Sequence, residues 1–137
     1  MRLTKLTQHL EDREFRKATT ALRQIWVLGN GYLTEAAPWT AMKTDVERAG
    51  TVVNIGLNLV SLFARLSAPF VPFAAASISE ALGEPEPTQW PDLADGLPNF
   101  LNPGNPIRAP DVLFRKVEDV QVAEWRERFG GPEVSAI

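Results

Sequence analysis

Cysteine is absent from this sequence, and histidine occurs once, as His9. Without cysteine the chain can form no disulfide, no thiolate nucleophile and no cysteine-bound zinc site. A single imidazole cannot make a histidine-rich metal site, and the usual catalytic triads would lack either their base or their nucleophile. The sequence therefore predicts no metal site, no cofactor and no catalytic activity for this chain alone.

A long uninterrupted apolar run is also missing. The most apolar stretch, residues 51–76, contains Asn54, Asn58, Arg65 and two prolines, which break it before it reaches the ~20 apolar residues that a membrane span requires. The first ten residues lack the continuous apolar core of a secretory signal. We therefore expect no membrane span and a cytoplasmic location.

What the chain does contain is enough apolar sequence for one folded domain: 137 residues, of which 45% are hydrophobic and 23% are charged. The charge is uneven, because residues 1–50 carry a net +2 and the remainder a net −5. The total net charge of −3 does not favour the binding of a phosphate backbone. Any contact with nucleic acid should therefore be local and assisted by aromatic side chains.

Hydrophobic periodicity predicts helices. Apolar residues recur at steps of three and four over Asp12–Leu33, and Pro38 prevents the helix from continuing. Asp45–Leu66 is apolar on nearly every side, which is typical of a central helix. Its polar residues fall in one narrow stripe: Asn54, Asn58, Ser61 and Arg65. Gly50 and Gly56 lie within it, and we expect both to let another helix approach closely.

A third helix is predicted over Pro72–Leu82, and a short one over Asp119–Phe129. Between Gly83 and Arg115 lie seven of the eleven prolines, which indicate an irregular connection. The expected fold is all-α, a small helical bundle with an irregular Pro-rich connection and a C-terminal helix. We divide the chain into a bundle (1–83), a connection packing on it (84–118), the C-terminal helix (119–131) and a tail (132–137).

Trp39 is the strongest candidate for a functional residue, because it directly follows Pro38 on a predicted loop between two helices. Two interpretations are open. The indole either caps the core from the loop, or it is presented as a platform on which an unstacked base can lie. Lys43, four residues further on, would then lie near enough to meet a phosphate.

The order of several motifs resembles that of a known family. Asn30, Tyr32, Pro38, Trp39 and Lys43 form the run N-x-Y-x-x-x-x-x-P-W-x-x-x-K, with similar flanking motifs at Arg13–Ala18, Leu66–Pro72 and Pro110–Val117. Over about Glu11 to Gly131 the sequence resembles the anticodon-binding helical domain of methionyl-tRNA synthetases, the class Ia enzymes that join methionine to its tRNA. The resemblance implies a bundle of that type, with methionine tRNA and the synthetase's catalytic domain as partners.

The resemblance also implies residue roles. Trp39 would stack on a base of the CAU anticodon, and Pro38 would shape the loop that presents it. Asn30 and Tyr32 would support the helix end or contact the RNA. Three basic residues are candidates for phosphate contacts: Lys43, Arg48 and Arg23. In the family the C-terminal helix folds back toward the catalytic domain, so three of its residues are expected to be anchors for that partner: Val122, Trp125 and Phe129.

Departures from the family pattern limit these roles. The sequence has neither ATP-binding signature of class I synthetases, H-I-G-H or K-M-S-K-S, and no cysteine for a zinc insert. It should not activate methionine by itself. It begins after the helix that carries further anticodon-reading residues, and Thr34 stands where many members have an acidic residue. We expect a C-terminal part of a bacterial synthetase that binds the anticodon; the alternative is a helical protein-interaction module without RNA binding.

Overall fold

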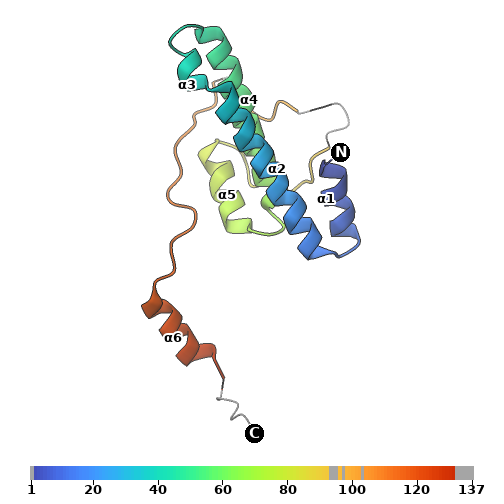
Figure 1. The fold of residues 1–137 in the computed structure, drawn as a ribbon, viewed down its shortest axis with the longest axis vertical. Coiled ribbons are helices and arrows are strands. Elements are labelled where there is room, and N and C mark those ends of the chain that lie inside the picture. Colours follow the sequence, from blue (N-terminus) through green and yellow to red (C-terminus); the bar gives the residue numbers. More distant parts are fainter. Residues whose placement is uncertain (1, 93–95, 97, 103, 132–137) are drawn as a thin grey trace.

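The computed structural model describes residues 2–92, 96, 98–102 and 104–131 (Figure 1). In these ranges the chain forms six helices and no strand: α1 (Arg2–Glu11), α2 (Phe15–Ala36), α3 (Pro38–Ala41), α4 (Val46–Ser67), α5 (Pro72–Ala81) and α6 (Asp119–Phe129). The predicted all-α class is confirmed. The predicted tail, 132–137, lies outside the described residues.

Four of the helices were predicted with bounds that differ by a few residues at most. α2 begins at Phe15 because Arg13 adopts a left-handed conformation (φ 60°) that separates it from α1. α4 begins after Asp45, whose Oδ1 accepts the backbone N–H of Arg48 at 2.9 Å and so caps a free donor of the first turn. α1 and α3 were not predicted. The segment predicted as a loop around Trp39 is therefore partly a short helix.

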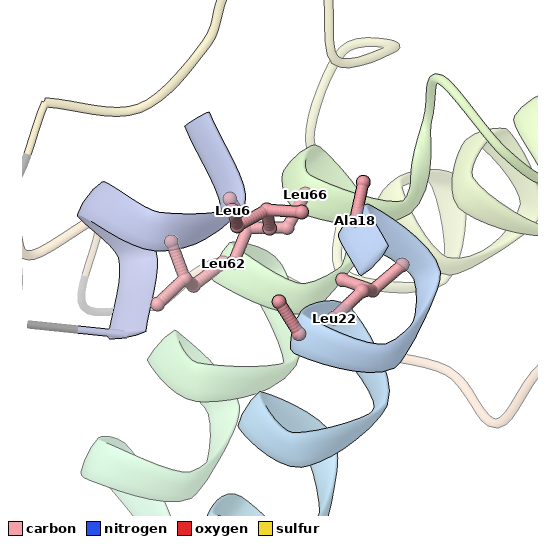
Figure 2. Close-up of a cluster of buried hydrophobic side chains, with 6 residues drawn as sticks. Leu6, Ala18, Leu22, Leu62 and Leu66 are labelled. Carbon is pink, nitrogen blue, oxygen red and sulfur yellow. The ribbon is translucent and has the colours of Figure 1, made fainter. Parts of the chain in front are cut away.

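The core lies where α1, α2 and α4 meet (Figure 2). Leu6 of α1 and Leu66 of α4 are completely buried, and both pack in one cluster with residues of α2 and α4: Ala18, Ala21, Leu22 and Leu62. Burying a leucine side chain stabilises a fold by about 1.5–3 kcal/mol. Packing of Leu6 therefore explains why α1 folds although a helix of ten residues is marginal alone.

Two glycines allow α2 and α4 to approach each other. A Cβ on Gly29 would overlap the ring of Phe63, and a Cβ on Gly56 would lie 2.8 Å from Cδ2 of Leu33. At Gly56 we expected the backbone of another helix, and the structure instead places the Leu33 side chain of α2 there. The expectation for Gly50 is wrong, because no described residue of another element lies within 4 Å of the position that a Cβ would take there.

We expect Gly29→Ala to lower the free energy of unfolding and Gly31→Ala to raise it. Both glycines lie within α2, where alanine gains about 1 kcal/mol in helix propensity. At Gly29 the new methyl group must displace the Phe63 ring, and such overpacking costs about 1–3 kcal/mol. Gly31 has open space around it and is the matched control. Urea denaturation measures both, and equal stabilisation by the two variants would contradict the close approach.

The polar stripe of α4 holds the Pro-rich connection. Asn58 accepts the backbone N–H groups of Phe100 (2.7 Å) and Leu101 (3.2 Å). Arg65 forms an ion pair with Glu84 (2.8 Å), and the Ser61 hydroxyl donates to the same carboxylate (2.5 Å). These three α4 side chains therefore bind two separate parts of the connection.

The connection also reaches other helices. The Trp90 indole N–H donates to the Thr7 hydroxyl of α1 at 3.0 Å, across 83 residues of sequence. The backbone N–H of Arg108 donates to the carbonyl of Ala81 at the end of α5 (2.9 Å). Residues 109–118 are exposed, and Figure 1 shows α6 apart from the bundle. Of the expected anchor residues in α6, Val122 is half-buried, while Trp125 and Phe129 are 48% and 70% exposed.

α4 is long and apolar enough to pass for a membrane span by length and composition, with a mean hydropathy of 1.4 in its best window. It is also the helix against which α2, α3 and α5 all pack. Core helices of soluble proteins have the same composition, so α4 is interpreted as the central helix that the sequence predicted.

Candidate nucleic-acid interface

The geometry around Trp39 begins with the end of α2. Ala37 is the one residue between α2 and α3, and it adopts a left-handed conformation (φ 41°). Its N–H donates to the carbonyl of Leu33 at 3.0 Å, which closes the last turn of α2. Pro38 then occupies the first position of α3, where a missing N–H costs no hydrogen bond. The chain therefore changes direction at a single residue just before Trp39.

Trp39 lies on α3 with its side chain on the surface. α3 packs against α4 through Ala41, its one buried residue. The Trp39 side chain is 61% exposed, so the indole does not cap the core. Of the two interpretations left open by the sequence, exposure fits the platform.

The other candidates from the same motif are spread around this end of α2. Asn30 is exposed and Tyr32 is half-buried. Residues two positions apart in an α-helix are separated by about 200° around its axis. The side chains of Asn30 and Tyr32 therefore lie on different faces of α2 and do not converge on one ligand atom. Thr34 is exposed, and its hydroxyl donates to the carbonyl of Asn30 at 2.9 Å.

Basic residues near Trp39 are mixed with acidic ones. Lys43 is exposed in the turn after α3, and Arg48 is exposed in the first turn of α4 beside Glu47. Arg23 lies thirteen residues before Ala36, the last residue of α2. It is therefore about 20 Å along the helix from the end of α2 that adjoins α3 and Trp39. Lys43 and Arg48 therefore lie in the turn and helix that follow α3, whereas Arg23 lies far from α3 along α2.

Sequence reasoning missed two apolar residues at this end of the bundle. Met42 and Val46 follow Trp39 by three and seven positions, and both side chains are more than half exposed. Their spacing from Trp39, three and seven residues, is typical of one helix face, but Trp39 belongs to α3 and Val46 to α4. Of the three exposed side chains, Trp39 is the one with a ring on which a base can stack.

The part of the chain that the structure describes holds no cluster of metal-ligating side chains beside this surface. Within residues 2–92, 96, 98–102 and 104–131, no group of three or more histidine, aspartate or glutamate residues is placed to hold a metal ion. What the geometry offers is an exposed aromatic ring, adjacent apolar groups and separate cations. Such a surface can bind a nucleic acid or a protein.

Comparison with known proteins decides the family. The family model for the anticodon binding domain of methionyl tRNA ligase matches residues 1–134. The chain belongs to this family. The match extends the resemblance to include α1, and it does not favour the alternative of a protein-interaction module without RNA binding.

Full-length relatives agree with this membership. The chain is 54% identical over 134 residues to a methionine–tRNA ligase of Caulobacter sp. (strain K31), which covers 96% of this chain and 23% of that ligase. It is 49% identical to the methionine–tRNA ligase of Maricaulis maris (strain MCS10) and 48% identical to that of Cereibacter sphaeroides (strain ATCC 17025). In both cases the match covers 95% of this chain and 23% of the relative. The chain spans about a quarter of the length of these relatives.

Proposed function

We propose that this chain binds the anticodon loop of methionine tRNA and recognises its CAU anticodon, with Trp39 as the stacking platform. The observation that carries the proposal is the 61% exposure of Trp39 on a helix that follows a one-residue joint in an anticodon-binding domain. A base that leaves its stack gains about 1–3 kcal/mol by lying on such a ring. A joint of one residue has fewer conformations than a longer loop, which lowers the entropy lost when the ring is immobilised.

The remaining motif residues have supporting roles in this proposal. Pro38 and Ala37 set the direction of α3, and the half-buried Tyr32 stabilises the end of α2. Asn30 is exposed and can offer an amide to a base edge, which is needed because stacking alone does not identify a base. Lys43 neutralises a phosphate beside the platform.

The chain works in this proposal as part of a larger enzyme. The second partner is the catalytic domain of a methionyl-tRNA synthetase, which supplies ATP and methionine chemistry that this chain lacks. The exposed Trp125 and Phe129 of α6 are available to contact that domain. We place the activity in the cytoplasm, and it requires no cofactor or metal bound to this chain.

We expect Trp39→Ala to lower the affinity for CAU-bearing methionine tRNA by about 5- to 150-fold, which is the equivalent of losing one stacked base. The preference over a tRNA with an altered anticodon should shrink with it, because the base that loses its platform is no longer held against the groups that read its edge. The free energy of unfolding should change by less than about 0.5 kcal/mol, because the side chain is mostly exposed. Filter binding and urea denaturation measure the two quantities.

Trp125→Ala is the matched control, because Trp125 is a partly exposed tryptophan on α6, away from α3 (Figure 1). This variant should keep both the affinity and the preference. Equal discrimination between the two tRNAs by wild type and Trp39→Ala would refute the role of Trp39. A large loss of stability in Trp39→Ala would instead mean that the indole is structural.

A further inference from the structure

A second feature of the molecule lies at the other end of α2, where α1 runs beside it (Figure 1). Between the two helices lies an open hollow of about 520 Å³ that is lined by basic and neutral polar side chains and one alanine. No carboxylate is among the described residues that line it. These residues are Arg2, Lys5 and His9 of α1 with Arg16, Lys17, Thr20, Ala21 and Gln24 of α2. We call it the α1–α2 groove.

The groove continues along α2. A second hollow of about 240 Å³ shares Arg2, Thr20 and Gln24 with the first and adds Arg23, Val27 and Leu28. Its described lining is again free of carboxylates. The Arg2 guanidinium donates to Oε1 of Gln24 at 3.2 Å, which ties the two helices together across the groove. The basic surface is therefore concave and extends over several turns of α2.

Part of the positive charge is already neutralised. Glu14, in the turn between the helices, contacts Lys17 at 2.6 Å and His9 at 2.9 Å. Its hydrogen bonds to Lys17 and His9 hold the pKa of the Glu14 carboxyl below its ordinary value. Four further cations make no ion pair with any residue that the structure describes: Arg2, Lys5, Arg16 and Arg23.

This concentration of positive charge contrasts with the whole chain, whose formal net charge is −3. Four such cations around one groove attract a ligand with several regularly spaced negative charges more strongly than one with a single charge. Guanidinium groups match phosphate oxygens in a bidentate geometry. A phosphodiester backbone has regularly spaced negative charges, one on each nucleotide, and it presents phosphate oxygens to guanidinium groups.

We propose that the α1–α2 groove binds the phosphate backbone of the same RNA whose anticodon lies at Trp39. This inference rests on the proposed function. Sixteen residues of α2 separate Thr20 in the groove from Ala36 at the helix end, which corresponds to about 24 Å. A trinucleotide at Trp39 cannot reach the groove, whereas the stem that continues from an anticodon loop extends over such a distance.

An acidic protein segment is the competing occupant. Protein interfaces are usually centred on buried aromatic or aliphatic anchors, but the apolar side chains of the groove are confined to Ala21 and to Val27 and Leu28 at one end. The lining is otherwise polar or basic, which is typical of surfaces that bind a nucleic-acid backbone.

The test compares Arg16→Gln/Arg23→Gln with Arg115→Gln/Arg126→Gln in the 137-residue chain. Both double variants remove two positive charges, and the second pair lies outside the groove in the exposed connection and α6. Affinity for methionine tRNA is measured from about 50 to 200 mM salt. We expect the groove variant to lose about tenfold or more in affinity at low salt, and to reduce the slope of log affinity against log salt by about 1–2.

This loss should be the same for a tRNA with an altered anticodon, since phosphate contacts carry no sequence information. Binding of the free trinucleotide CAU should not change. If the groove variant matches the control variant in affinity and slope, the groove is not an RNA contact and the inference is wrong. If Trp39→Ala leaves discrimination intact while the groove variant still reduces the slope, the proposed platform fails and the groove stands. If the wild-type chain binds no RNA, both fail.

Discussion

Glu84→Ala is expected to lower the free energy of unfolding by about 3–5 kcal/mol, the usual cost of removing one partner from a buried ion pair. The Glu84 side chain is 6% exposed. It accepts hydrogen bonds from Arg65 at 2.8 Å and from Ser61 at 2.5 Å. Without the carboxylate, the Arg65 guanidinium would keep, among the described residues, the Phe100 ring at 4.5 Å as compensation for its lost hydration. Urea denaturation followed by circular dichroism measures the change.

Two further variants test the cause. Glu86→Ala removes an exposed carboxylate two residues away, and it should change stability by less than about 0.5 kcal/mol. Arg65→Met/Glu84→Leu removes both charges, and it should recover most of the stability because no uncompensated charge remains. If Glu84→Ala costs no more than Glu86→Ala, the ion pair does not hold the connection on α4.

Asn58→Ala is expected to lower the free energy of unfolding by about 2–6 kcal/mol, because it leaves two backbone donors without a partner, each costing about 1–3 kcal/mol. Asn58 is 3% exposed, and its Oδ1 accepts the N–H groups of Phe100 and Leu101. The same substitution should speed the hydrogen exchange of these two amides more than that of amides in α2. Denaturation and exchange measured by NMR therefore report the loss and its location.

Asn54→Ala is the matched control one turn earlier in α4. The Asn54 carbonyl that accepts from Asn58 Nδ2 at 2.9 Å belongs to the backbone, so alanine keeps it. Only a longer contact of 3.3 Å between the two side chains is lost. The cost should stay below about 1 kcal/mol. A cost equal to that of Asn58→Ala would show that the hydrogen bonds from the connection to Asn58 are not the cause of the loss, since alanine favours a helix more than asparagine does.

The polar stripe illustrates how much of the fold sequence could predict. Periodicity along α4 placed Asn54, Asn58, Ser61 and Arg65 on one face, and the prolines indicated an irregular connection. The sequence could not predict that the polar stripe contacts the connection, because the partners of the stripe are 19 to 43 residues away along the chain. No local pattern encodes such a register. α1 was missed for a related reason, since its packing on α2 and α4 stabilises a helix that its ten residues alone predict only weakly.

The candidate site was predicted in part. Pro38 ends the helical pattern, so the sequence placed Trp39 correctly at a helix end. Whether its indole was buried depended on the orientation of α3, which is set by the burial of Ala41 against α4. Similarly, the positive charge of residues 1–50 was apparent from composition, but the groove exists only because α1 places Arg2 opposite Gln24 of α2.

The one-residue joint at Ala37 makes α2 a fixed spacer. Because α2 is continuous from Phe15 to Ala36 and α3 follows after a single residue, the separation between Thr20 and Trp39 depends only on the number of residues in one helix. Deleting one turn would shorten it by about 5.4 Å, and inserting one residue would rotate Trp39 by about 100° about the helix axis. Length changes within Phe15–Ala37 would therefore misalign the two ends of the molecule, whereas the connection at 109–118 lies outside this spacer and can vary in length without changing it.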